Sequence, residues 1–155
     1  MENVFERLKT LNTSYFSANK MPFLYHEVGY FGGPGPNSGE YVYLGKVLEF
    51  RYMMHMQNLF RRYIKLADAR NFGSEWGLLR NEDAIVMVDN HDAQRGQISD
   101  IKKSLAFRFP RLHKMSTAFM LAWPFGLAKV MSSYWWPQVL EVTECARNLV
   151  LIFNF

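Results

Sequence analysis

Four short apolar segments, separated by stretches with helical spacing, constrain the fold of this chain more than any other feature. The segments are residues 22–28, 46–50, 84–88 and 128–131. Short apolar runs without polar alternation are typical of strands buried on both faces, as in a parallel sheet covered by helices. Because such strands alternate with helices, the sequence predicts an α/β fold built on a parallel sheet.

The stretches between and around these segments repeat apolar residues at intervals of three and four, which places them on one helix face. In chain order, the four sets are Val4, Leu8 and Leu11; Met53, Met56, Phe60 and Tyr63; Leu112, Met115, Phe119 and Ala122; and Val139, Val142, Ala146 and Leu149. The third set belongs to a longer region after residue 92 that we expect to be helical, with an interruption at Pro110.

Polar residues gather at the ends of two apolar segments. Glu27 lies at the end of the first, and Asp89, Asn90, His91 and Asp92 follow the third. In a barrel of alternating strands and helices, these strand ends carry the catalytic residues, but such a barrel needs eight strands and about 250 residues. Four strands in 155 residues can form only half of one. Taken alone, single acids at strand ends are more often caps or salt-bridge partners, whereas four adjacent polar residues indicate a binding site.

Charge and composition argue against several other functions. The net charge of +4 is modest, and the basic clusters at 61–65 and 102–103 fit solvated helix faces better than a nucleic-acid-binding surface. No apolar run approaches the roughly 18 residues that span a membrane. The N-terminal residues show no secretory signal. The single cysteine, Cys145, excludes an internal disulfide and a cysteine zinc cluster.

Two segments together resemble one known family. Residues 88–92, followed by Gln94, Arg95 and Gly96, resemble the signature after the seventh barrel strand of animal-type α-amylases, and residues 23–28 resemble the segment after the fifth strand. The resemblance extends in order and spacing from about residue 4 to residue 137. It implies a partial (β/α)8 TIM barrel, strands 5–8 with their helices, over residues 1–137. We expect residues 138–155 to form a separate helical C-terminal segment, as in a truncated or spliced gene product, because they resemble a later helix of the family rather than the loop that normally follows residue 137.

The resemblance also implies site roles. Glu27 matches the general acid/base, Asp92 matches the carboxylate that stabilises the transition state, and His91 matches a sugar-binding histidine. The family performs endo-hydrolysis of α-1,4-glucosidic bonds in starch and glycogen by a retaining mechanism. In such a mechanism one carboxyl protonates the leaving oxygen and another forms a covalent glycosyl intermediate. The implied binding partner is therefore an α-glucan, and the implied location is extracellular.

Chloride and calcium enter through the same resemblance. Asn90 matches one chloride-binding residue, and Lys129 stands where the family most often has arginine. Arginine offers two donors to an anion and lysine a point charge, so a salt bridge from Lys129 to one of the acids is an equal alternative. The family's calcium ligands match no residue of this chain.

Several departures from the family shape our expectation for activity. The resemblance starts at the helix before the fifth strand, so the nucleophilic aspartate that follows the fourth strand has no match here. Residues 97–100 replace a glycine-rich loop, and Gly29, Tyr30 and Pro34 stand where substrate-contacting or acidic residues are usual. We therefore expect the chain alone to be inactive.

The alternative is a non-catalytic remnant that binds carbohydrate or another protein. Half a barrel leaves two open sheet edges, which favours self-association, including closure of two half-barrels into a dimer. Trp76 and Trp123 are expected to pack in the core, whereas Trp135 and Trp136 are candidate rim residues for sugar stacking.

Overall fold

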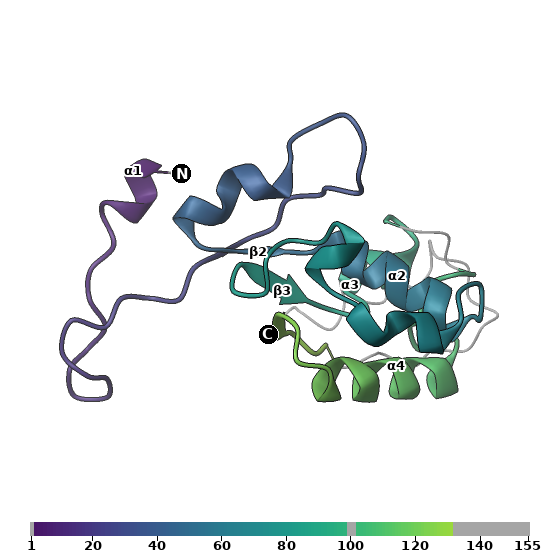
Figure 1. Cartoon of the computed structure of the whole chain (residues 1–155). Coiled ribbons are helices and arrows are strands. Elements are labelled where there is room, and N and C mark those ends of the chain that lie inside the picture. Colours follow the sequence, from purple (N-terminus) through teal and green to yellow (C-terminus); the bar gives the residue numbers. More distant parts are fainter. Residues whose placement is uncertain (1, 99–101, 132–155) are drawn as a thin grey trace.

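The computed structural model describes residues 2–98 and 102–131 (Figure 1). It contains a four-stranded parallel sheet whose strands lie side by side in chain order. The predicted α/β class and parallel sheet are thereby confirmed, although each strand is shorter than its apolar segment. The strands are β1 (Tyr25–His26), β2 (Lys46–Leu48), β3 (Ala84–Val86) and β4 (Leu127–Ala128).

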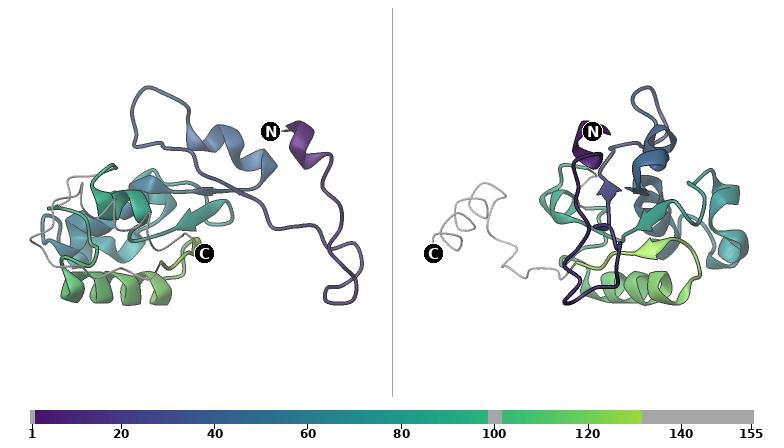
Figure 2. Two further views of the ribbon diagram at one scale, coloured as in Figure 1. Left: turned by 180° about the vertical axis from the view of Figure 1, so that it is seen from behind. Right: turned by 90° about the vertical axis from the view of Figure 1, so that its left-hand side faces the viewer.

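Helices cover the sheet and fill the connections between its strands. Two longer helices, α2 and α4, pack against each other and on the same face of the sheet (Figures 1 and 2). The helical elements are α1 (Glu2–Phe5), α2 (Phe50–Phe60), α3 (His91–Arg95) and α4 (Pro110–Ala122), with 3-10 helices η1 (Ser38–Leu44), η2 (Leu66–Asn71) and η3 (Ser74–Trp76).

The two central strands, β2 and β3, are buried on both faces apart from the half-buried Lys46, which explains the apolar residues in them. Ala84 and Val86 point to the face covered by α2 and α4, where they join a core that includes Tyr52, Met56 and Met120. The opposite face carries a second, smaller cluster. Its members are Leu48, Phe50, Met53, Ile85, Met87 and Ala93. Leu48 and Ile85 are partners in register on β2 and β3, so this cluster starts from the middle of the sheet.

The first predicted helix is wrong in length. Helix α1 ends at Phe5, so Leu8 and Leu11 lie beyond it. The side chain of Asn12 accepts a hydrogen bond from the Ser14 backbone amide at 2.9 Å, a local turn that competes with helix formation. Val4 is 66% exposed, so this short helix also lacks the apolar packing that normally stabilises helices.

The expected long helical region after residue 92 is also wrong. Helix α3 ends at Gly96, which adopts a left-handed φ of 78° and satisfies the last carbonyls. Pro110 begins helix α4 rather than interrupting one, because a proline at the first helical position loses no internal hydrogen bond.

The apolar faces of the two long helices are confirmed in part. In α2, Met53 and Met56 are fully buried, but the helix ends before Tyr63, which is 67% exposed. In α4, Leu112 and Phe119 pack against the core as predicted, whereas Met115 and Ala122 are exposed. Ser116 is buried instead, and its hydroxyl donates to the Leu112 carbonyl at 2.8 Å.

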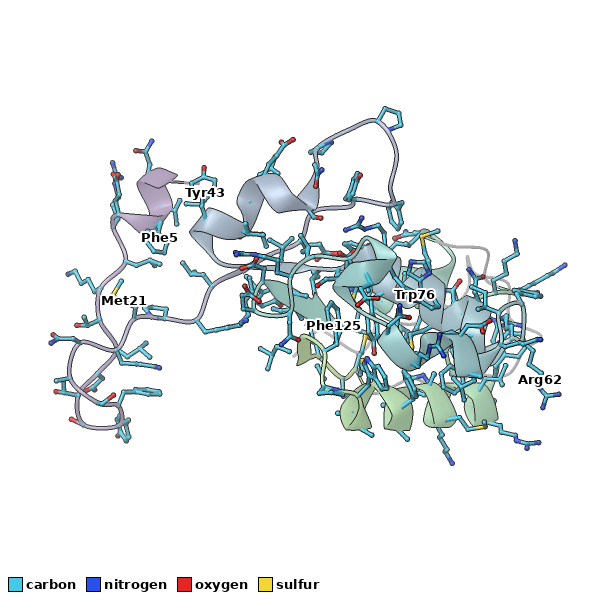
Figure 3. All side chains as sticks on the ribbon, viewed as in Figure 1. Phe5, Met21, Tyr43, Arg62, Trp76 and Phe125 are labelled. Atoms are coloured by element: carbon cyan, nitrogen blue, oxygen red, sulfur yellow. The ribbon has the colours of Figure 1, made fainter. Side chains whose placement is uncertain are left out.

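Residues 6–24 form an arm that extends away from the sheet (Figures 1 and 2). Between this arm and η1 lies an open apolar hollow of about 630 Å³, with Phe5, Met21 and Tyr43 around it (Figure 3). Within the described residues, no helix has the length and apolar character required to cross a bilayer. The predicted helix at 139–149 and the candidate rim residues Trp135 and Trp136 lie outside the described residues.

Gly126, directly before β4, is a glycine whose replacement we expect to damage the fold. Its φ is +67°, and an added Cβ would lie 2.7 Å from Val86 Cγ1 and 3.2 Å from the Ala84 carbonyl oxygen. We predict that Gly126→Ala lowers the free energy of unfolding by about 2–4 kcal/mol, from left-handed strain and overpacking. Urea unfolding measures this. Gly33→Ala is the control, because nothing lies within 4 Å of its added Cβ. Equal losses in both variants would contradict the prediction.

Candidate active site

The carboxyl ends of the parallel strands bring acidic residues from distant parts of the chain to one edge of the sheet. Glu27 follows β1, Glu49 follows β2, and Asp89 and Asp92 follow β3. This is the edge at which the sequence predicts a site. Two of the four carboxylates are bound within the protein, Asp92 is half-buried, and Glu27 is exposed.

Glu49 is the first of the two bound carboxylates. Its side chain is 0% exposed and caps the start of α2, where Oε1 accepts a hydrogen bond from the Arg51 backbone amide at 3.1 Å. The Arg51 guanidinium donates to both carboxylate oxygens, at 3.0 and 2.7 Å, and the Leu79 amide donates to Oε2 at 2.8 Å. Four donors surround this buried charge, so it cannot reach a ligand.

Asp89 is the second. It is 4% exposed, and its Oδ2 accepts a hydrogen bond from Gln94 Nε2 at 2.8 Å, while Oδ1 lies 3.9 Å from His113 Nδ1. The neighbouring Asn90 caps α3, with its Oδ1 accepting from the Ala93 amide at 2.8 Å. These contacts give half of the polar cluster 89–92 a role in joining β3 to α3.

Glu27, His91 and Asp92 are the members of the edge that face solvent. Glu27 is exposed, directly before the buried Val28. His91 Nε2 lies 3.2 Å from Asp92 Oδ1, and their side chains are 56% and 28% exposed. The edge therefore offers two accessible carboxylates on non-adjacent strands, with an imidazole beside one of them. Their roles as acid/base, stabiliser and sugar ligand stay predictions.

The two residues implied in a chloride site each have a protein contact. Asn90 follows β3, and its carbonyl oxygen caps α3. Lys129 follows β4, and its Nζ donates to the Tyr25 hydroxyl at 2.9 Å and lies 4.8 Å from the centre of the Tyr25 ring. Lys129 thus joins the two outer strands across the sheet and contacts a phenol rather than a described acid. These contacts show no prepared anion site.

A metal site is equally unsupported by this part of the chain. Among residues 2–98 and 102–131, no group of three or more His, Cys, Asp or Glu side chains is placed to hold a metal ion. The residues described here therefore do not fit a calcium site, and no step is derived through calcium.

His55 on α2 is a titratable group beside the Glu49–Arg51 pair. Burial lowers its pKa below the ordinary 6.5; Glu49 opposes this effect and Arg51 adds to it. Its ring packs edge-on against Trp76 at 5.1 Å between centroids. Because the unfolded state takes up the proton first, stability falls as pH drops from about 6.5 toward the lower folded value. We predict that His55→Phe flattens this fall between pH 7 and 5 in urea unfolding. An unchanged slope would contradict the prediction.

The two tryptophans in the described residues, Trp76 and Trp123, pack in the core as predicted. Trp123 Nε1 donates to the Phe72 carbonyl at 2.8 Å, and its ring stacks on Phe119 at 5.4 Å. Trp76 packs against the same core (Figure 3).

The role of Glu49 was not predicted from the sequence, because residues 46–50 were interpreted as one apolar segment. A charged residue just before a helical pattern is an N-cap signal that could have revealed it.

No family model matches the chain. The α-amylase of Acarus siro is 45% identical over 141 residues, which are 91% of this chain and 27% of that protein. Human pancreatic α-amylase is 39% identical over 140 residues, 89% of this chain and 27% of that protein. The crystal structure of α-amylase I from Eisenia fetida, 40% identical, superimposes with a TM-score of 0.85 over 90% of this chain and 29% of that one.

The chain is related to the animal-type α-amylases. The resemblance inferred from the sequence is confirmed, and the chain spans 27% of the length of these two relatives. A glutamate-to-glutamine variant of the Eisenia fetida α-amylase has been solved in complex with maltohexaose, and it matches this chain with the same TM-score of 0.85. The four parallel strands agree with a partial α-amylase barrel.

Proposed function

We propose that this chain forms the acid/base side of an α-amylase-type site for α-1,4-glucans. The observation that carries the proposal is the pair of carboxylates, the exposed Glu27 and the half-buried Asp92, at the carboxyl edge of a parallel sheet similar to that of α-amylases. The maltohexaose complex of the Eisenia fetida relative supports an α-glucan as the ligand. In this proposal the four strands are strands 5–8 of the barrel.

The proposed mechanism assigns one task to each exposed group. Glu27 donates a proton to the glycosidic oxygen as the bond breaks and later accepts one from water. Asp92 stabilises positive charge at the sugar ring, and His91, held near Asp92 at 3.2 Å, donates to a sugar hydroxyl. A retaining reaction also needs a nucleophilic carboxylate on the opposite side of the sugar.

The chain's own acids at this edge do not supply that nucleophile in our account. Glu49 and Asp89 are 0% and 4% exposed and are bound to protein donors. Among the described residues, only the proposed acid/base and stabiliser remain at this edge, so we expect the chain alone to bind α-glucan without cutting it. This arrangement favours, as a second candidate, a carbohydrate-binding remnant or an interaction protein. Complete endo-hydrolysis of starch or glycogen would need a carboxylate from outside the described residues.

Calorimetric titration with maltohexaose tests the ligand assignment. We expect binding that weakens at least tenfold in His91→Ala, through loss of a hydrogen bond to the sugar. Arg80→Ala is the control, because Arg80 is 68% exposed and lies before β3, at the other end of the sheet. Equal affinity in wild type and His91→Ala would remove His91 from the site. No binding by the wild type would remove the proposed function.

The outer strands give a further expectation for partners. Within the described residues, β1 pairs only with β2 and β4 pairs only with β3, which leaves two strand edges open. Such edges pair readily with other chains. We predict self-association at micromolar concentration, measured by sedimentation velocity; a monomeric profile would contradict it. An extracellular location is proposed from the α-amylase relationship alone.

A further inference from the structure

The loop that follows Glu27 is contacted by two side chains from the start of α2. Tyr30 lies beneath the Arg51 guanidinium, whose Cζ is 4.9 Å from the centre of the ring. Next to it, the Phe31 ring lies 5.3 Å from the ring of Phe50. These contacts are made three and four residues after Glu27, so they restrain the segment that carries the proposed acid.

Arg51 is itself held in a fixed orientation. Its Nε and one terminal nitrogen donate to separate oxygens of Glu49, at 3.0 and 2.7 Å, which forms a two-point contact. The Glu49 side chain is 0% exposed and that of Arg51 is 19% exposed, so solvent competes little for either group. A guanidinium held by two parallel hydrogen bonds presents its flat face in one direction, as stacking on an aromatic ring requires.

The same pair also joins a third segment to this arrangement. Glu49 accepts a hydrogen bond from the Leu79 amide at 2.8 Å. In the loop after β1, an added Cβ at Gly32 would lie 3.8 Å from Arg51 Cδ. In the loop after η3, an added Cβ at Gly77 would lie 4.0 Å from a terminal nitrogen of Arg51. Arg51 therefore runs between the loop after β1 and the loop after η3, close to the backbone of both.

We infer that Glu49, Arg51 and Tyr30 form a clasp that holds the loop bearing Glu27 in place for the α-glucan. Arg51 and Tyr30 are positioning residues in this inference, which rests on the proposed role of Glu27. A general acid acts only within hydrogen-bond reach of the atom it protonates, and a displacement of about 1 Å costs a large factor in rate. The clasp also gives a function to Tyr30, which stands where the family usually has acidic or substrate-contacting residues.

The test compares loop order and sugar affinity in variants that separate the clasp from the fold. Tyr30→Leu removes the aromatic face and leaves the buried ion pair intact, whereas Tyr30→Phe keeps the face. The double variant Glu49→Gln with Arg51→Met removes both charges together. Arg80→Met is the control, because it removes an exposed arginine that also pairs with an acid. Nuclear magnetic relaxation of residues 29–33 reports loop order, calorimetry reports maltohexaose affinity, and thermal unfolding reports the fold.

In Tyr30→Leu and the double variant, we expect the backbone order parameter of residues 29–33 to fall from about 0.85 to below about 0.6. Maltohexaose affinity falls about fivefold to thirtyfold with it, the scale of a lost cation–π contact. Tyr30→Phe and Arg80→Met keep both values.

Unchanged loop order in Tyr30→Leu, or an equal loss in Tyr30→Phe, would overturn the clasp. If the wild type binds no maltohexaose, the proposed function fails, while the order parameters still decide whether the clasp exists.

Discussion

Replacing Glu49 by leucine is expected to lower the free energy of unfolding by about 3–5 kcal/mol, enough to unfold much of the protein near room temperature. The change leaves the Arg51 guanidinium without its carboxylate in a site where that side chain is 19% exposed. It also removes the acceptor of the Leu79 amide. Two costs therefore lower the free energy of unfolding: the uncompensated charge of Arg51 and the unpaired backbone amide of Leu79. Urea unfolding followed by circular dichroism measures the loss.

Glu82→Leu is the matched control for this prediction. Glu82 also pairs with an arginine, Arg80, at 3.4 Å, but the two side chains are 64% and 68% exposed. Exposed pairs contribute at most about 1 kcal/mol, so this variant should unfold close to the wild type. A loss below 1 kcal/mol in Glu49→Leu would show that the buried pair is not essential to the fold.

The second large effect that we expect is the absence of α-glucan hydrolysis by the chain alone. We predict that the 155-residue chain releases reducing sugar from maltohexaose at the rate of the buffer, although it binds the sugar. Loss of one member of a catalytic set typically lowers the rate by about four orders of magnitude or more. Glu27→Gln should then leave the hydrolysis unchanged, because the described part of the chain offers the proposed acid no nucleophile. Reducing-sugar release, measured over days, tests this.

Two outcomes of that assay have different meanings. Hydrolysis that disappears in Glu27→Gln would show that a nucleophile lies within this chain and would contradict the passive roles given to Glu49 and Asp89. Hydrolysis that persists in Glu27→Gln would point to a contaminating enzyme, and a second preparation by a different purification route would then be required to show no activity.

The sheet could be predicted because its two central strands, β2 and β3, are buried on both faces. The three residues of β3 are at most 2% exposed. A strand buried in this way is a continuous apolar run, which can be recognised in the sequence without knowing which strands pair with it. Helices α2 and α4 could be predicted for a related reason, since each buries one face against the sheet. The length of the first helix could not, because Val4 is 66% exposed and a turn at Asn12 competes with the helix.

The candidate site could be predicted only in part. The exposed acids follow strands and are recognisable by position, whereas the roles of Glu49 and Arg51 depend on segments 30 residues apart that only the fold brings together. The contact between Tyr25 and Lys129 joins residues 104 positions apart across the sheet. No local pattern encodes such contacts, so the split between bound and exposed carboxylates emerged only from the structure.

The central claim is that the carboxyl edge of this sheet is an α-glucan site. The most direct test is titration of the isotope-labelled chain with maltohexaose, followed by the backbone amide resonances. Our account predicts the largest shifts at residues 27–31 and 89–92. Shifts concentrated at the apolar hollow beside Phe5 and Tyr43, or no shifts at millimolar sugar, would contradict it.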